Sequence, residues 1–298
     1  MRDGELLEQT AIALDGATLE RLAERDPEAH ARLDRVELAK IAYASGGLSV
    51  TGMLARPKRP GRFPSVIYNR GGYGSSGVIS ARQAATQLAA IADRGYVVAA
   101  SQYRGNAGGE GRDEFGGGDL ADVLNLIALL DDMEAADPER IGMWGWSRGG
   151  LMTYLALART ERLRAAIAIS AVADLADYLA RRPEMEQRVF AKLLPTDRAL
   201  RAAAIEARSP IRWPDRLCKT TPLLVLHGSA DWRVHPGQAL AMASALYEAK
   251  HPLRFVLFEG ADHGLAEFSG ETLRICHDWL DRYLRDGEPW PSLEPHGL

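Results

Sequence analysis

Short apolar runs and longer amphipathic segments alternate along most of this chain. Residues 36–44 and 48–55 alternate apolar with polar positions around a Ser-Gly-Gly turn, which predicts an antiparallel hairpin. Six further apolar runs have the length of strands, and helical patterns separate them. We expect these strands over 63–69, 96–101, 140–144, 164–170, 222–227 and 253–258, and helices over 80–94, 119–135, 151–158, 237–249 and 269–285.

Alternating strands and helices predict an α/β fold, with a mainly parallel eight-stranded sheet and helices on both faces. Two segments depart from this rhythm. Residues 1–35 have leucines and alanines at helical spacing and predict an N-terminal helical extension, which packs on the domain, covers the site or forms a homodimer contact. Residues 171–221 predict a helical cap insertion within a domain that spans 36–298, on the side where strands end and ligands bind.

The composition narrows the class of protein. With 298 residues, 46% hydrophobic and 26% charged, the chain is typical of a globular protein, and its net charge of −4 favours neither nucleic acid nor an anionic membrane as a partner. The N-terminus lacks the layout of a signal peptide and no run approaches a membrane span, so we expect a cytoplasmic protein. Cys218 and Cys276 lack metal-type spacing and are expected to be reduced thiols, with a single bridge between them left open.

One stretch carries the first sign of chemistry. Residues 145–149, Gly-Trp-Ser-Arg-Gly, match the G-x-S-x-G nucleophile elbow between an expected strand and an expected helix. The turn strains the backbone at Ser147, and Gly145 and Gly149 supply the small neighbours that it requires. A serine hydroxyl is a weak nucleophile at neutral pH, so a base and an orienting carboxylate must follow.

The chain supplies both groups in the expected order. Asp231 follows the strand at 222–227, and His263 follows the strand at 253–258. The order Ser147, Asp231, His263 is that of the α/β-hydrolase fold, so we expect these residues to form a catalytic triad.

Other acids and histidines compete less well. Asp262 adjoins His263 in sequence, which makes poor geometry for orienting the ring, and Glu259 would replace Asp231 only if the Asp231 loop points away. His227 ends a strand and is expected to bond loop backbone, whereas His235 is expected at the surface or the rim of the site.

Acyl transfer also needs donors for the oxyanion. We expect the backbone N–H of Arg148 and, from the glycine-rich loop 70–77, that of Gly72, with Gly71 and Tyr73 as alternatives. The residues expected to contact substrate are Arg70, Tyr73, Trp146, Tyr178, Phe190 and Trp213. Arg70 and Arg148 suit either a substrate carboxylate or a structural ion pair. Triad chemistry requires neither a metal nor an organic cofactor.

Together these motifs resemble the catalytic domain of the prolyl oligopeptidase (S9) family, over roughly residues 36–286. The resemblance rests on the segments 102–105, 119–122, 137–142, 145–150, 227–234 and 260–264. It implies an α/β-hydrolase fold and the same triad of Ser147, Asp231 and His263. Peptidases of the family usually carry an N-terminal propeller, whereas about 35 residues precede the fold here, so we expect a stand-alone catalytic domain.

Two further positions depart from the family pattern. Arg148 stands where the family's peptidases often have tyrosine, and Arg70-Gly71-Gly72-Tyr73 replaces a His-Gly-Gly-Pro segment. The sequence therefore favours a serine hydrolase of small esters, with an aminopeptidase or oligopeptidase acting on short peptides as the alternative. A non-catalytic binding protein on the same fold is a remote alternative, against which the complete triad argues.

Overall fold

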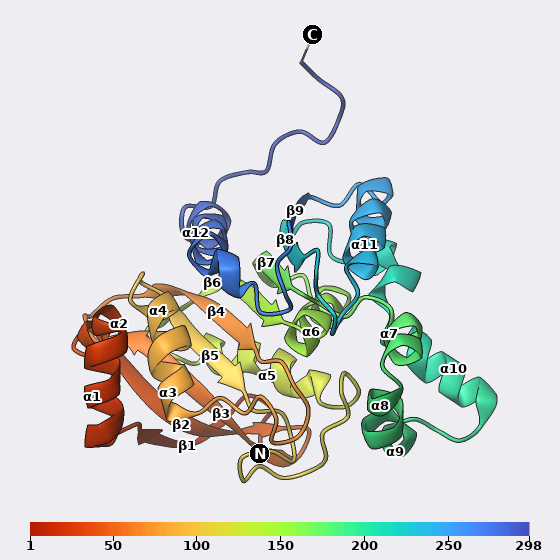
Figure 1. The fold of residues 1–298 in the computed structure, drawn as a ribbon. Coiled ribbons are helices and arrows are strands. Elements are labelled where there is room, and N and C mark those ends of the chain that lie inside the picture. The colour runs from red at the N-terminus through yellow and green to blue at the C-terminus, as the bar shows by residue number, and fades with distance from the viewer. Residues whose placement is uncertain (298) are drawn as a thin grey trace. The chain divides into compact units, whose positions relative to one another are not determined.

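The computed structural model describes residues 1–297, which divide into a first unit of residues 1–143 and a second unit that begins at residue 144 (Figure 1). Strand β6 (Ala136–Trp146) crosses the boundary between the units. It is longer than the expected strand at 140–144, and it delivers the chain to the elbow.

The first unit contains the expected hairpin, β2 (Val36–Ser45) and β3 (Leu48–Pro57), paired antiparallel with Tyr43 opposite Val50. Strand β4 (Phe63–Asn69) is buried along its whole length and pairs parallel with β5 (Val97–Ser101), which in turn pairs antiparallel with β3. A strand buried on both faces shows as a continuous apolar run, which is why both were visible in the sequence.

The expected helical extension of residues 1–35 needs one correction. Residues 6–11 form strand β1 (Leu6–Ala11), antiparallel to β2, so residues 1–297 contain nine strands where eight were expected. All six residues of β1 are exposed, so no buried face marks the strand in the sequence. Helices α1 (Gly16–Arg25) and α2 (Pro27–Arg32) follow, each capped by an aspartate that accepts a backbone N–H of the first turn.

The remaining helices of the first unit lie where the apolar periodicity predicts them. Helix α3 (Ala81–Gln83), the π-helical turn η1 (Ala84–Leu88) and α4 (Ala89–Ala92) are continuous, and α5 (Leu120–Asp131) follows β5. The buried Asp122 of α5 binds the guanidinium of Arg104 at 2.7 Å, in a structural ion pair that ties the segment after β5 to α5.

The second unit continues as a parallel α/β arrangement. Strands β7 (Leu163–Ile169), β8 (Leu223–Gly228) and β9 (Leu253–Phe258) pair parallel in that order. Helix α11 (Pro236–Glu248) packs on β8 and β9, and α12 (Ser269–Leu280) packs on β7 and β8 (Figure 1). The buried helix α6 (Arg148–Leu157) follows β6, and the turns η5 (Ala266–Phe268) and η6 (Asp281–Arg285) flank α12.

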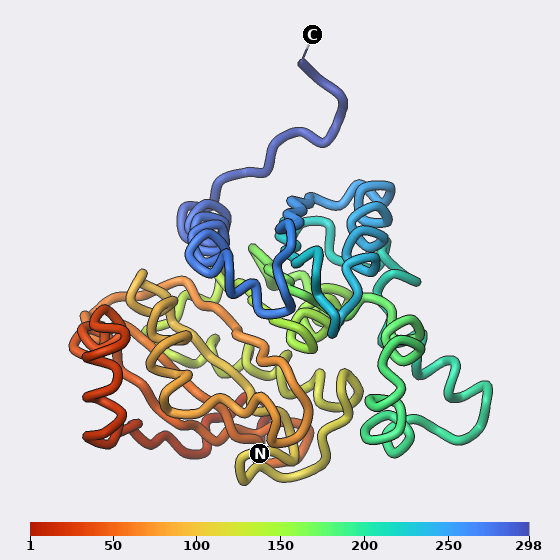
Figure 2. Tube along the Cα trace, viewed as in Figure 1, coloured from red at the N-terminus to blue at the C-terminus, as the bar shows by residue number. Residues whose placement is uncertain are grey.

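Residues 171–221 are helical, in the place where the sequence departs from its rhythm. The segment comprises α7 (Leu175–Arg181), α8 (Pro183–Met185), η2 (Glu186–Phe190), α9 (Ala191–Leu193), α10 (Arg198–Glu206), η3 (Pro210–Arg212) and η4 (Pro214–Arg216). In Figure 2 this green segment leaves the side of the second unit that carries α11, and the C-terminal tail leaves from the side of α12.

Two further expectations concern covalent chemistry and membranes. Cys218 and Cys276 are both free thiols, so the bridge left open by the sequence is not formed. Within residues 1–297, no helix combines the length and the apolar character that crossing a bilayer requires.

Candidate active site

The serine lies on a strained turn between β6 and α6. Ser147 has φ 57° and ψ −120°, and its backbone N–H donates to Ile169 O of β7 at 2.7 Å. A side chain at Gly145 would place its Cβ 2.0 Å from Gly149 O, so only glycine fits this close approach. The backbone thus holds Ser147 in the conformation that the nucleophile elbow requires.

The acid and the base follow neighbouring parallel strands. Gly228 at the end of β8 lies opposite Phe258 at the end of β9, so the loops that carry Asp231 and His263 leave the same edge of the sheet. His263 Nδ1 forms a hydrogen bond of 2.7 Å with Asp231 Oδ2. The carboxylate is fully buried, whereas the imidazole ring is partly exposed. An acceptor on Nδ1 fixes the ring's tautomer and leaves Nε2 available as a base.

The carboxylate of Asp231 is held by several donors. Its Oδ1 accepts the backbone N–H groups of Arg233 at 2.8 Å and Val234 at 3.0 Å. Burial by itself would raise the pKa of this carboxyl, but interactions with His227 and His263 outweigh burial and hold the pKa well below its usual range. Asp231 therefore stays ionised throughout the neutral pH range.

A hydrogen bond ties the elbow to the loop of the base. Trp146, the residue before the serine, donates from Nε1 to the backbone carbonyl of His263 at 3.2 Å. The structure thus brings together Trp146, Asp231 and His263, all expected at the site. The direct contact between Ser147 Oγ and His263 Nε2 stays a prediction.

The competing residues are engaged elsewhere. Asp262 accepts the backbone N–H of Gly264, and His235 accepts that of Gly237 at the start of α11. Glu259 is exposed. His227 bonds the carbonyl of Val234 at 2.9 Å, which confirms its expected contact with loop backbone. The same nitrogen also lies 3.1 Å from Asp231 Oδ2, a contact that was not expected from the sequence although the two residues are only four apart.

The two expected oxyanion donors each have suitable backbone. Arg148 is the first residue of α6, so its N–H lies at a helix N-terminus, where partial positive charge gathers. Gly72 has φ 76°, and a Cβ there would lie 2.0 Å from Ser76 O, so the loop requires glycine at this position. That both N–H groups serve one oxyanion stays a prediction.

The arginines beside these positions have buried side chains. Arg70 is 2% exposed and donates to its own loop and to Gln102 O, at 2.6 Å from Nη2, while its guanidinium lies 4.7 Å from the centre of the Tyr103 ring. These contacts favour a structural role for Arg70 over the alternative of binding a substrate carboxylate. Arg148 is equally buried at 1% exposure. Tyr73 is partly exposed and lies beside Phe115.

The aromatic residues expected from the cap differ in their surroundings. Tyr178 of α7 interacts electrostatically with Asp231, which relates it to the acid, and burial raises the pKa of its phenol. Phe190 is fully buried, and Trp213 is 9% exposed and donates to Glu206 O. These two side chains pack inside the helical segment and offer little surface to a ligand.

One contact beside the acid was not expected from the sequence. Trp232, which follows Asp231, is 67% exposed, and the guanidinium groups of Arg182 and Arg233 lie 4.8 Å and 5.3 Å from its rings. Arg182 also donates from Nη1 to Arg233 O at 3.2 Å, so the segment 171–221 contacts the loop of the acid. The adjacency of Trp232 to Asp231 is a sequence signal, whereas nothing local marks Arg182.

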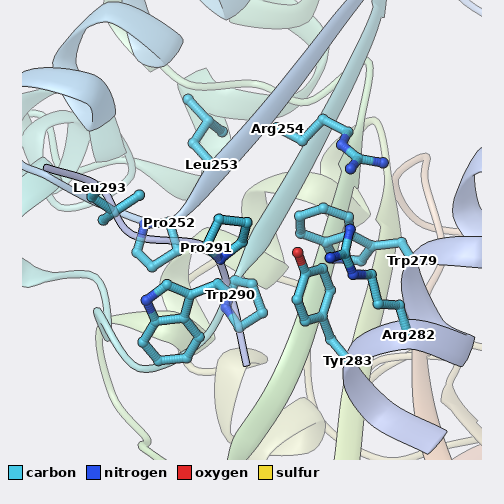
Figure 3. Close-up of a pocket in the computed structure, with 10 residues that line it drawn as sticks. Pro252, Leu253, Arg254, Trp279, Arg282, Tyr283, Trp290, Pro291 and Leu293 are labelled. Atoms are coloured by element: carbon cyan, nitrogen blue, oxygen red, sulfur yellow. The ribbon is translucent and has the colours of Figure 1, made fainter. Parts of the chain in front are cut away.

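A pocket elsewhere in the second unit is unrelated to these groups. Figure 3 shows it lined by Trp279, Tyr283 and Trp290. Its lining also includes Pro222 and Pro252, which directly precede β8 and β9. Asp231 and His263 follow the other ends of the same two strands. The pocket therefore lies at the opposite edge of the sheet and is not the substrate site of this chemistry.

The sequence is similar to a known peptidase family and to a bacterial peptidase. The sequence model of the prolyl oligopeptidase family matches residues 82–287. The chain is 29% identical to YtmA, an uncharacterized peptidase of Bacillus subtilis (strain 168), over 73% of this chain and 82% of that protein.

Two solved peptidases have similar structures. One is the acylaminoacyl peptidase of Pyrococcus horikoshii, with a TM-score of 0.73 and 21% identity over 88% of this chain and 44% of that chain. The other is a puromycin-hydrolyzing peptidase of Mycobacterium tuberculosis, with a TM-score of 0.69 and 26% identity over 84% of this chain and 39% of that chain. The chain thus spans most of the Bacillus protein and less than half of either solved peptidase.

Proposed function

Because the chain belongs to the prolyl oligopeptidase family, we propose that it is a serine peptidase that cleaves short peptides through an acyl-enzyme on Ser147. The family and the α/β-hydrolase fold expected from the sequence are confirmed by the family match and the solved structures. The similar proteins support the peptide alternative over the ester preference of the sequence analysis.

The observation that carries the proposal is the Asp231–His263 pair. The 2.7 Å hydrogen bond to Nδ1 makes Nε2 the basic nitrogen, and Trp146 links the base's loop to the turn of Ser147. In the proposed first step, Ser147 Oγ attacks the scissile carbonyl while His263 Nε2 takes the hydroxyl proton. The ionised Asp231 then stabilises the imidazolium that forms.

The remaining steps, which complete acylation and then release the acyl group, use the same residues. The tetrahedral oxyanion is stabilised by the N–H groups of Arg148 and Gly72, our proposed donors. Its collapse breaks the C–N bond, and the leaving amine takes the proton from His263. Water then attacks the acyl-enzyme, and His263 takes a proton from that water before returning it to Ser147.

The proposed substrates are short peptides and aminoacyl amides. This class is the chemistry common to the peptidases that the chain resembles, one of which hydrolyses puromycin. The partly exposed Trp146 and Tyr73 are the proposed substrate contacts, together with Tyr178 near the acid. We leave out Phe190, which is fully buried, and Trp213, whose indole N–H is bonded to Glu206 O inside the helical segment.

A panel of chromogenic substrates tests the proposal. Alanine p-nitroanilide, its N-acetyl derivative and a dipeptide p-nitroanilide would be compared with p-nitrophenyl butyrate. We expect turnover of at least one amide, with kcat falling about 10⁶-fold in Ser147→Ala and about 10⁴-fold in Asp231→Asn. Turnover of the ester alone, with amide rates no higher than those of Ser147→Ala, would instead establish an esterase.

A further inference from the structure

The acid of the proposed triad contacts a second histidine. His227 lies in β8 and is fully buried, and its Nε2 is 2.9 Å from Val234 O and 3.1 Å from Asp231 Oδ2. The same Oδ2 accepts the 2.7 Å hydrogen bond from His263. Asp231 therefore lies between two imidazole rings, one of which is proposed to act as the base.

The partners of His227 determine where its proton lies. Val234 O and the Asp231 carboxylate are both acceptors without hydrogens, so Nε2 must carry the proton. Nδ1 is buried and has no hydrogen-bond partner within residues 1–297. A lone pair left unpaired there costs less than the buried, unpaired N–H of a charged ring, so the geometry favours the neutral ring.

We propose that His227 is a positioning residue that holds the catalytic acid in place through the turn of residues 231–234. Asp231 Oδ1 accepts the N–H groups of Arg233 and Val234. The Nε2–H of His227 contacts both the carbonyl of Val234 and Asp231 Oδ2. The turn is thus held both by its own backbone N–H groups and by a side chain of β8. Rotation of the carboxylate away from His263 would break these contacts.

Other titratable or charged side chains also lie around the Asp231 carboxylate. His263 and Tyr178 are the other titratable groups related to this carboxylate, and burial raises the pKa of the Tyr178 phenol, so that phenol stays neutral. Arg182 and Arg233 carry fixed positive charge nearby.

Removing His227 has two expected effects. The carboxylate becomes freer to rotate, so the rate of serine acylation falls. It also loses a donor, so Oδ2 becomes a stronger acceptor for His263 and favours the imidazolium. The base then loses its proton only at higher pH, which moves the acid limb of the pH–rate profile upward.

The test uses His227→Leu, His227→Gln and a matched control. The inference rests on the proposed triad, so the readout is the rate at which a fluorophosphonate probe labels Ser147 across pH 5–9, which needs no peptide substrate. Gln keeps an N–H near the position of Nε2, whereas Leu removes it. His251→Leu is the control, because His251 is also buried in the second unit but bonds the backbone of Pro252 and Cys218.

We expect His227→Leu to lower the plateau rate about 10–100-fold and to move the acid limb upward by roughly 0.5–1 pH unit. His227→Gln should recover most of both effects, and His251→Leu should leave the limb unchanged while lowering the melting temperature.

Three outcomes would overturn the inference. An acid limb that stays in place in His227→Leu would do so, as would an equal limb shift in His251→Leu. If His227→Leu does not fold, His227→Gln with a limb and rate far from those of the wild type would also contradict it. A wild-type protein that the probe does not label would overturn the proposed function itself.

Discussion

The indole N–H of Trp146 donates a 3.2 Å hydrogen bond to the backbone carbonyl of His263. These residues are 117 positions apart, and they join the turn of the proposed nucleophile to the loop of the proposed base. The carbonyl lies on the backbone of the base itself, so this contact restrains the position of the imidazole relative to the elbow. We therefore expect the proposed site to depend on this link as well as on the three proposed triad residues.

Trp146→Phe tests the link, because it keeps an aromatic ring and removes the N–H. We expect kcat on a p-nitroanilide to fall about 5–20-fold, which corresponds to one hydrogen bond of about 1–1.7 kcal/mol. KM should change less than kcat, since the restraint acts on the base. A fall in kcat/KM that lies entirely in KM would show that Trp146 serves only as a substrate contact.

Arg182→Ala tests the contact between the helical segment and the loop of the acid. The substitution removes the cation–π interaction with Trp232 and the hydrogen bond to Arg233 O. We expect kcat/KM to fall about 5–30-fold, from an estimated 1–2 kcal/mol of combined interaction energy. Arg212→Ala is a matched control in the same segment, because Arg212 is exposed and pairs with Asp174 instead. Equal effects of the two substitutions would contradict a specific role for Arg182.

The pH dependence of stability should report the lowered pKa of Asp231. A carboxylate with a depressed pKa stabilises the folded state fully above its unfolded pKa of about 3.9, and this stabilisation is lost as pH falls toward the folded pKa. We therefore expect the free energy of unfolding of wild type minus that of Asp231→Asn to shrink as pH falls from about 5 to about 3. Urea titrations at each pH measure it, and a difference that does not shrink over this range would contradict the assignment.

Gly145→Ala should destabilise the fold, because its Cβ would lie 2.0 Å from Gly149 O and 2.5 Å from Thr153 Oγ1. We expect a loss of more than about 3 kcal/mol in the free energy of unfolding, or no folded protein. Gly270→Ala in α12 is the control, since a Cβ there meets nothing within 4 Å, and we expect a change within about 1 kcal/mol. Similar stability of the two variants, measured by urea titration, would show that the elbow tolerates a side chain.

Local patterns in the sequence were enough to predict much of the fold. Burial on both faces produced the apolar runs of β4, β5 and β8, and amphipathic periodicity marked α11 and α12. Strand β1 could not be found in this way, because its six residues are exposed and its pairing with β2 is made by backbone atoms that carry no sequence signal.

Glycine spacing and strand ends are local features, so the family, the elbow and the order of Ser147, Asp231 and His263 could be read directly from the sequence. Which donor meets which acceptor follows only from the three-dimensional packing. It turned the Arg70 guanidinium onto backbone carbonyls, placed His227 against Asp231 and brought Arg182 to Trp232. Such contacts depend on how loops from distant elements close in three dimensions, and no periodicity along the chain records that closure.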